Sequence, residues 1–415
     1  MRRAPTALLV ATLAGALAAG GAAAATDPST AGPFAPATTT LALPVGGGVT
    51  RAADVHYPGT AGGVDAAAGR CPVVLFGHGF TRSKARYADL GRHLASRGFV
   101  VVIADYRCGV LTGCDAVANA AEMSALVDWI VARDADPASI FFNRIAVDAI
   151  GVSGHSAGGL QAILAAALDP RVRAVAPMDP VDGSGLGGQA LASLGVPVAI
   201  TASERSSCNA FGSPEALYRA AQAPKRWLLV IGATHCDPEQ EAELGCTLAC
   251  GGWDAARHRR YLGAVAGWFE LFLRCDAGAL EWTFGAEVAA DVTAGRLAWD
   301  ADMTPSAPAG LAARWDGSAV ALSRQPARCG TTTAWSVERR DLATGASITV
   351  ADGLDPALAA WRDTAVAPGG RYAYSARDRF ADFEGAFDGA ASPEVAVEVP
   401  MARSPRRRLS SQGPR

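Results

Sequence analysis

The sequence predicts an α/β fold with a mostly parallel sheet covered by helices, followed by an all-β sandwich. Two observations carry this prediction. Before about residue 275, short apolar runs alternate with helix-like stretches, as expected for parallel strands that helices bury on both faces. Beyond residue 305, short alternating segments are separated by turn signals, as expected for a β-sandwich. A chain of 415 residues, 50% of them hydrophobic, is long enough to hold both regions.

The apolar runs are the expected strands of the parallel sheet, and they lie at 72–76, 99–103, 145–152, 172–178, 196–201 and 227–231. The helix-like stretches lie at 86–96, 117–133, 158–168, 214–221 and 256–273. A last element, or a bridge to the next region, is expected over 282–299. Because such sheets place their active sites at the carboxyl ends of the strands, we expect the chemistry in the loops that follow these runs.

The second region is expected to contain strands at 319–323, 334–339, 347–351, 371–376 and 394–399. Turn signals such as Asp316-Gly317 and Thr344-Gly345 separate them. We therefore expect an α/β catalytic domain over 26–300 and a β-sandwich over 305–400. The remaining 401–415 is rich in arginine and is expected to be a disordered basic tail, with a weak surface anchor as the alternative.

The N-terminal residues 1–25 have the features of a signal peptide. Arg2 and Arg3 precede an apolar stretch over 7–19, and small alanines over 23–25 offer a cleavage site. We expect a mature chain that starts near Thr26 and is secreted, with a periplasmic or cell-surface location, or an uncleaved anchor, as alternatives. No later segment has 18 uninterrupted apolar residues, so no stable membrane insertion is expected.

Charge and cysteine content narrow the class of protein further. The net charge of −3 argues against a nucleic-acid binder, because such domains are usually clearly basic. We also expect the protein to be a monomer. Nine cysteines fit disulfide bonds in an oxidising compartment, and the odd number leaves at least one unpaired. Cys108 and Cys114 could close a short loop. A zinc site is the alternative interpretation of His235, Cys236, Cys246 and Cys250. Their spacing matches no standard zinc finger, so we expect no metal and no cofactor.

The motif Gly154-His155-Ser156-Ala157-Gly158 follows the apolar run 145–152 and opens a helix-like stretch. This strand-to-helix turn lifts a serine hydroxyl above the sheet, next to the amino end of a helix. Ser156 is therefore the predicted nucleophile.

A serine nucleophile needs a base within hydrogen-bond reach. His235 follows the run 227–231 and is the only histidine that comes last in the order Ser, Asp, His at a carboxyl-end loop. We predict His235 as the base. We expect His155 to point away from the nucleophile and His78 to shape a turn.

The third member of a triad orients the imidazole of the base. Asp179 ends the run 172–178 and is the preferred acid, while Asp182 and Glu204 remain alternatives. The oxyanion needs two backbone donors. The amide of Ala157 and the amide of Phe80, in the glycine-containing loop 77–81, are the candidates.

Residues 70–240 resemble the chlorophyllase-like branch of the α/β-hydrolases and the related platelet-activating-factor acetylhydrolases. The resemblance rests on Gly77-His78-Gly79-Phe80, on the serine motif, and on Asp179-Pro180-Val181-Asp182-Gly183. It implies that the acid follows the strand after the nucleophile, which favours Asp179. The stretch Gly79-Phe80-Thr81 together with 94–99 is also similar to bacterial cutinases and polyester hydrolases, whose acid follows the next strand.

Residues 305–400 resemble a fibronectin type III domain. The resemblance rests on Pro308-Ala309-Gly310-Leu311, Asp363-Thr364 and Tyr372-Ala373-Tyr374, and it implies that one of the two tyrosines forms a corner hydrogen bond. The chain departs from that family at Arg324, where a core tryptophan is usual. Trp315 and Trp335 are the candidates to fill that volume.

From the signal-peptide features, the serine motif with its candidate partners, and the hydrolase resemblance, we expect a secreted serine hydrolase that cleaves lipid-like or polymeric carboxylic esters through an acyl-enzyme. An amidase or peptidase could use the same triad. A surface-binding protein with weak hydrolase activity is the other alternative.

Overall fold

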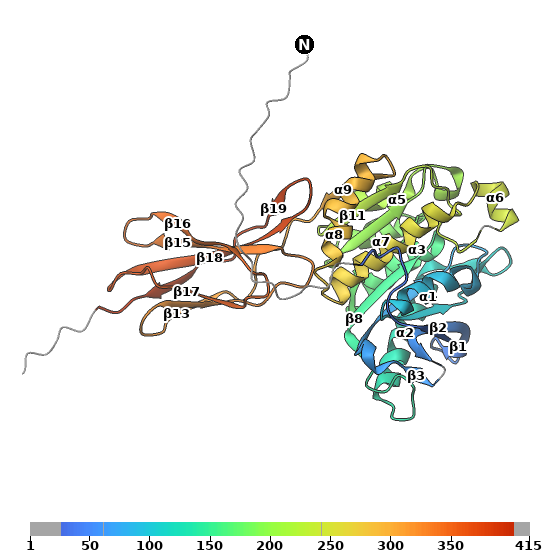
Figure 1. Cartoon of the computed structure of the whole chain (residues 1–415), viewed down its shortest axis with the longest axis horizontal. Coiled ribbons are helices and arrows are strands. Elements are labelled where there is room, and N and C mark those ends of the chain that lie inside the picture. The colour runs from blue at the N-terminus through green and yellow to red at the C-terminus, as the bar shows by residue number, and fades with distance from the viewer. Residues whose placement is uncertain (1–25, 61, 242, 402–415) are drawn as a thin grey trace, which may run out of the picture.

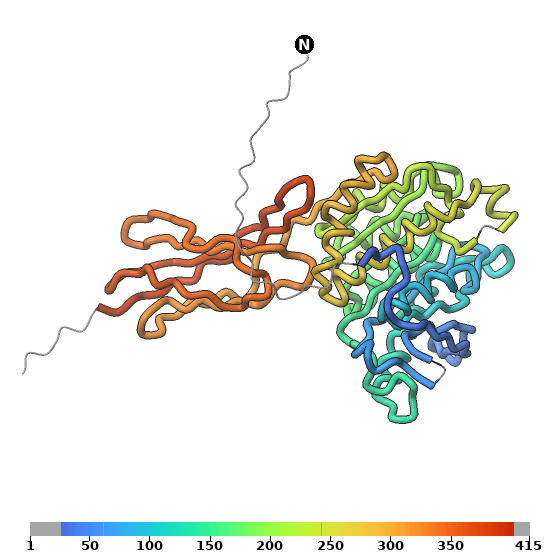
Figure 2. Tube along the Cα trace, viewed as in Figure 1, coloured from blue at the N-terminus to red at the C-terminus, as the bar shows by residue number. Residues whose placement is uncertain are grey.

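The computed structural model describes residues 26–60, 62–241 and 243–401. The predicted signal peptide 1–25 and nearly all of the predicted basic tail lie outside these residues. In the described part of the chain, no helix has the length and the apolar character needed to span a membrane. Figures 1 and 2 show two bodies joined end to end, a helix-covered sheet and a smaller region made only of strands.

A large mixed sheet forms the first body. Its strands follow the order β1-β2-β5-β4-β8-β9-β10-β11-β12, and the strands from β5 to β11 pair in parallel. Antiparallel strands complete both edges. The bounds are β1 Pro36–Pro44, β2 Thr50–Thr60, β4 Cys71–Gly77, β5 Val100–Ala104, β8 Ile145–Gly154, β9 Val172–Val175, β10 Val198–Ala202, β11 Lys225–Val230 and β12 Leu297–Asp302, with the short β3 Gly63–Val64 beside β2.

Alternate side chains of the buried strands enter different cores. In β4, Val73 and Leu75 pack in one apolar cluster, whereas Val74 and Phe76 pack in the other. The first cluster includes side chains from α2 Ala116–Ala135, α3 Ala157–Leu168, α4 Leu186–Leu191 and α5 Ser213–Ala220. The second includes side chains from α1 Ala88–Ser96, α7 Ala255–Leu273, α8 Ala279–Thr283 and α9 Ala286–Thr293. Helices therefore cover both faces of the sheet, which confirms the predicted α/β class.

Local sequence signals explain where the two longest helices begin. Asp115 accepts hydrogen bonds from the amides of Val117 and Ala118 at the start of α2. Asp254 does the same for Ala256 and Arg257 at the start of α7. Such N-caps satisfy amides that have no partner within the helix. Each predicted apolar run also corresponds to a strand, although β9 ends at Val175 and only isolated bridges continue to Met178.

The second body consists of two antiparallel sheets. One has the order β13-β14-β17, with bounds Ala312–Trp315, Val320–Ser323 and Ala360–Asp363. The other has the order β16-β15-β18-β19, with bounds Ser347–Leu354, Ala334–Asp341, Arg371–Ala381 and Ala386–Asp388, and β20 Val395–Glu398 also pairs with β18. Side chains of both sheets, including Leu322 and Val337, share one apolar cluster. This arrangement is consistent with the predicted sandwich, whose boundaries and family stay predictions.

The interior of this region contains the tryptophan and the tyrosine that the sequence singles out. Trp335 is buried, whereas Trp315 is half-buried. The guanidinium of Arg324 lies 4.4 Å from the centre of the Trp335 ring and pairs with the buried Asp378. The hydroxyl of Tyr372 accepts a hydrogen bond of 3.0 Å from the amide of Ala367. Trp335 thus occupies the core, and Tyr372 makes a bond of the kind expected at a tyrosine corner.

An aromatic cluster joins the two bodies. Phe380 in β18 is fully buried and meets Phe284 edge-on, with ring centres 4.8 Å apart. Phe383 packs against Trp299 of β12, with ring centres 5.1 Å apart. A disulfide between Cys275 and Cys329 crosses the same junction. The strand region therefore contributes side chains to the core of the helix-covered body.

Candidate active site

Ser156 lies on a sharp turn between β8 and α3. Its φ angle is +57°, a conformation that is uncommon for a residue with a side chain. The turn is possible because glycines stand two residues before and two residues after Ser156. A Cβ atom at Gly154 would lie 2.1 Å from the carbonyl oxygen of Gly158, and one at Gly158 would lie 2.1 Å from that of Gly77. The two glycines of the predicted motif thus allow β8, α3 and the loop after β4 to meet at Ser156.

His235 lies between Ser156 and Asp179. The hydroxyl oxygen of Ser156 is 2.9 Å from Nε2 of His235, and Nδ1 of His235 is 2.5 Å from Oδ2 of Asp179. An ionised carboxylate only accepts, so Nδ1 carries the proton and Nε2 is free to accept from the serine hydroxyl. The structure therefore brings together the three residues predicted as nucleophile, base and acid, in an arrangement able to activate the hydroxyl.

Asp179 is held by several donors. It is fully buried, has a φ angle of +43°, and follows the isolated bridge at Met178. The amide of Ser203 donates to Oδ1 at 3.0 Å, and its hydroxyl donates to Oδ2 at 2.5 Å. The side-chain amide of Asn209 donates to Oδ1 at 3.3 Å. These contacts hold the carboxylate in the orientation in which Oδ2 accepts from Nδ1 of His235. Sequence reasoning missed Ser203 and Asn209, although Ser203 stands directly after β10.

The two alternative acids serve other loops. Asp182 accepts hydrogen bonds from the amide of Gly188 at 3.0 Å and from the hydroxyl of Ser184 at 3.0 Å. Glu204 accepts from the amide of Gly232 at 3.0 Å. Neither carboxylate contacts His235, so the geometry brings Asp179, and not these two, to the base.

The loop after β4 passes beside the serine. A Cβ atom at Gly79 would be 3.4 Å from that of Ser156, and Phe80 lines the same cavity as Ser156. Among the described residues, no acceptor is found for the backbone N–H of Phe80 or for that of Ala157. Both predicted oxyanion donors are therefore free to bind a ligand oxygen.

A cavity of about 420 Å³ opens at Ser156 and His235. One side is formed by the loop over 79–82. The other side is formed by α6 Leu244–Cys250, a short helix that sequence reasoning did not predict, together with Cys208. The cavity therefore lies between these two segments, beside Ser156 and His235.

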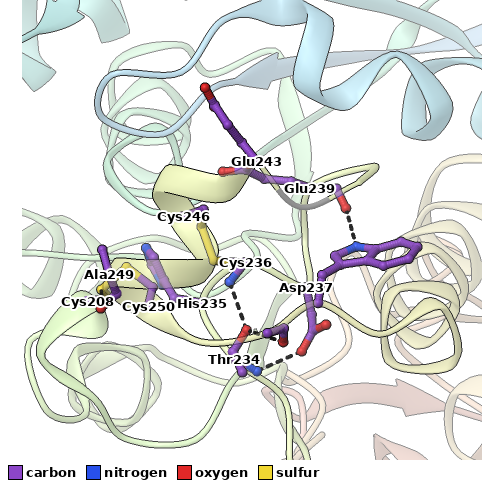
Figure 3. Close-up of a disulfide and its surroundings, with 12 residues drawn as sticks. Cys208, Thr234, His235, Cys236, Asp237, Glu239, Glu243, Cys246, Ala249 and Cys250 are labelled. Atoms are coloured by element: carbon purple, nitrogen blue, oxygen red, sulfur yellow. Dashed lines mark hydrogen bonds between the residues drawn. A yellow bond between two sulfur atoms is a disulfide. The ribbon is translucent and has the colours of Figure 1, made fainter.

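Two disulfides hold α6 at the cavity, as Figure 3 shows. Cys236, the residue after His235, pairs with Cys246, and Cys208 pairs with Cys250. The presence of disulfide bonds confirms the prediction, and the sequence had left these two pairings open. The pairings engage the three cysteines of the alternative zinc site. Cys108 pairs with Cys114 as expected, joining β6 Cys108–Gly109 to β7 Gly113–Cys114. Cys71 is unpaired and buried.

His155, which we expect to point away from the nucleophile, packs against the proposed base. Its ring centre lies 4.6 Å from that of His235, and its Nδ1 is 2.8 Å from the hydroxyl of Tyr87. Burial lowers the pKa of His155 well below its usual value, and the neighbouring His235 lowers it further. Both effects favour the uncharged form of His155. His78 contacts the carbonyl oxygens of Gly79 and Tyr106, in keeping with a turn-shaping role.

Sequence comparisons find similar proteins for the part of the chain that contains this site. A sequence model of the protein family described as PET hydrolase-like matches residues 17–250, a segment that contains every predicted site residue. Cutinase est2 of Thermobifida alba is 32% identical over 102 residues, which are 25% of this chain and 32% of that protein. The match thus spans about a third of that relative's length. Both matches are to carboxylic ester hydrolases, the class of enzyme that the sequence predicts. The chlorophyllase-like and fibronectin-like resemblances stay predictions.

Proposed function

The chain belongs to the PET hydrolase-like family, and on that premise we propose that it hydrolyses carboxylic esters, with Ser156 as nucleophile, His235 as base and Asp179 as acid. One observation carries the proposal. Hydrogen bonds of 2.9 Å and 2.5 Å connect the serine hydroxyl through the imidazole to a buried carboxylate, at the edge of an open cavity. This is the arrangement that makes a serine hydroxyl nucleophilic.

In the first half of the reaction, Ser156 Oγ attacks the ester carbonyl and its proton passes to Nε2 of His235. Asp179 stabilises the imidazolium that forms. His235 then gives the proton to the departing alcohol, leaving an acyl group on Ser156. In the second half, His235 takes a proton from water, the hydroxide attacks the acyl group, and the carboxylic acid departs as Ser156 regains its proton.

Negative charge develops on the carbonyl oxygen in both halves. The amides of Phe80 and Ala157 are the proposed donors to this oxygen, and their lack of acceptors among the described residues supports the assignment. The start of α3 at Ala157 adds the favourable end of a helix dipole. Donors that are already in place stabilise the charge without reorganisation.

The proposed substrates are lipid-like or polymeric esters. Large apolar side chains stand exposed on the segments that bound the cavity: Phe80 is 47% exposed, and Leu244 and Leu248 of α6 are 72% and 78% exposed. Exposed apolar groups around a site favour contact with an apolar surface. The disulfides support export to an oxidising compartment. The strand region, proposed as a fibronectin-like module, would act as a spacer or help hold the enzyme on its substrate.

The proposal is tested with purified mature protein and its Ser156→Ala variant. We would measure the release of 4-nitrophenol from a short and a long 4-nitrophenyl ester and the release of soluble acids from a PET film. The release of 4-nitroaniline from the matching 4-nitroanilides is measured in parallel. We expect the wild type to hydrolyse the esters and the variant to lose this activity. Hydrolysis of anilides alone would favour the amidase alternative, and equal rates for both proteins would overturn the proposed nucleophile.

A further inference from the structure

Tyr87 lies behind the active site, at the end of the short helix η2 Lys84–Tyr87. Its side chain is fully buried, and its ring packs against Phe76 of β4, with ring centres 4.7 Å apart. Burying a phenol without partners is costly, so a buried tyrosine hydroxyl normally has a hydrogen-bond role. Nothing in the proposed reaction uses Tyr87 directly.

The hydroxyl of Tyr87 contacts two of the segments that form the site. It accepts a hydrogen bond from the amide of Gly79 at 3.2 Å and lies 2.8 Å from Nδ1 of His155. Gly79 directly precedes Phe80, the proposed oxyanion donor, and His155 directly precedes the nucleophile. One hydroxyl thus bridges the loop after β4 and the turn that carries Ser156.

The direction of these bonds follows from their chemistry. A backbone amide can only donate, so the oxygen of Tyr87 accepts from Gly79. Among the described residues, the Tyr87 hydroxyl has no acceptor other than Nδ1 of His155, so its proton is directed to that nitrogen. Nδ1 of His155 then accepts, which leaves the proton of the neutral ring on Nε2. That Nε2 is buried and has no hydrogen-bond partner in the described part of the chain.

This network keeps a positive charge away from the base. The rings of His155 and His235 are 4.6 Å apart, so an imidazolium at His155 would oppose protonation of His235. Donation from Tyr87 to Nδ1 favours the uncharged ring.

The space between Gly79, His155 and Tyr87 is tight. A Cβ atom at Gly79 would be 3.3 Å from Nδ1 of His155 and 3.4 Å from the hydroxyl of Tyr87.

We infer that Tyr87 is a positioning residue, acting with His155 to set the loop that carries the Phe80 amide against the nucleophile turn. The inference rests on the proposed function, since the amide matters only when an oxyanion forms. Tyr87 does not touch the reacting atoms. Its effect is expected mainly on the transition state and little on the binding of the ester itself.

The test compares Tyr87→Phe with the wild type and with Tyr57→Phe. Tyr57 is equally buried, lies on β2, and serves as a control for the loss of a tyrosine hydroxyl away from the site. Removing an oxyanion donor outright costs ~10²–10³ in rate, so loosening one through Tyr87 is expected to lower kcat about tenfold with KM nearly unchanged. The inhibition constant of phenylboronic acid, which forms a tetrahedral adduct with a reactive serine, should rise by a similar factor.

Wild-type kcat and phenylboronic acid affinity in a folded Tyr87→Phe protein would overturn the inference. So would a loss matched by Tyr57→Phe. If Tyr87→Phe does not fold, His155→Gln and His155→Leu replace it, because only glutamine can accept from the Tyr87 hydroxyl. We expect the leucine variant to lose more kcat than the glutamine variant, and equal losses would overturn the inference. Failure of the proposed function is recognised separately, by a wild type that hydrolyses no ester.

Discussion

Nδ1 of His235 lies 2.5 Å from Oδ2 of Asp179, a residue that directly follows the bridge extending β9. The proposed acid therefore stands after the strand that follows the proposed nucleophile. Glu204, after the next strand, instead binds the amide of Gly232. This position agrees with the chlorophyllase-like resemblance and differs from that expected from cutinases, although the catalytic region matches a PET hydrolase-like family.

Replacing Asp179 with asparagine should lower kcat on 4-nitrophenyl butyrate by ~10³–10⁴, because the amide no longer stabilises the imidazolium or its tautomer. Glu204→Gln and Asp182→Asn are matched controls that change a carboxylate elsewhere, and both should stay within about threefold of the wild type, since indirect effects on a site are small for groups that do not contact it. A larger loss in Glu204→Gln than in Asp179→Asn would contradict this assignment and would make Glu204, after the next strand, the acid.

The disulfide between Cys236 and Cys246 should affect both stability and catalysis. Removing a disulfide typically costs about 2–4 kcal/mol of unfolding free energy. The double variant Cys236→Ala/Cys246→Ala also frees the residue next to His235, so kcat should fall as well. The control Cys275→Ala/Cys329→Ala removes a disulfide at the distant junction and should reduce the melting temperature alone. Denaturation curves and ester kinetics check this, and equal kcat values in the two double variants would contradict it.

The pair of His258 and Asp89 should make stability depend on pH. Burial opposes the charge on His258, but the hydrogen bond and charge of Asp89, together with the backbone carbonyl and charge of Asp237, outweigh it and raise the pKa of His258 above its usual 6.5. A raised pKa in the folded state stabilises the protein below pH 6.5, and this contribution is lost as pH rises through the folded pKa.

Unfolding free energies of the wild type and His258→Gln, measured from pH 5 to pH 9, should therefore differ most at the acidic end. Asp89→Asn removes the partner and should flatten the pH dependence in the same way. A difference between wild type and variant that grows toward alkaline pH would show that the pair does not act through protonation of His258.

The junction between the two bodies should carry a large part of the stability. Phe380→Ala leaves a cavity beside Phe284, and such a change typically costs about 3–5 kcal/mol. Rates on soluble esters well below the melting temperature should not change. The control Ile348→Ala alters a side chain that is 52% exposed on the same region, and it should have little effect on the unfolding free energy. If Phe380→Ala were as stable as this control, the two bodies would be energetically independent.

Sequence periodicity and motif spacing predict much of this structure. The helix expected over 117–133 is α2, because Asp115 caps it and its apolar side chains recur on one face. Ser156, His235 and Asp179 were identified because each follows a buried strand. The edge strand β1 was not predicted, since most of its side chains are exposed and its sequence lacks a buried apolar run.

Other features depend on contacts between distant segments. The position of α6 beside the cavity follows from the pairing of Cys208 with Cys250, and sequence alone does not reveal connectivity. Ser203 and Asn209 support Asp179 through loop packing, which leaves no local pattern. The orientation of His155 depends on Tyr87, which is 68 residues away.

The nucleophile is tested most directly by labelling with a fluorophosphonate, which reacts with an activated serine, followed by peptide mass spectrometry. We predict a single adduct on Ser156 in the wild type, with ester hydrolysis lost in proportion to labelling. Ser156→Ala should take up no label and hydrolyse no ester. An adduct on another residue, or full activity in protein labelled at Ser156, would contradict the proposed site.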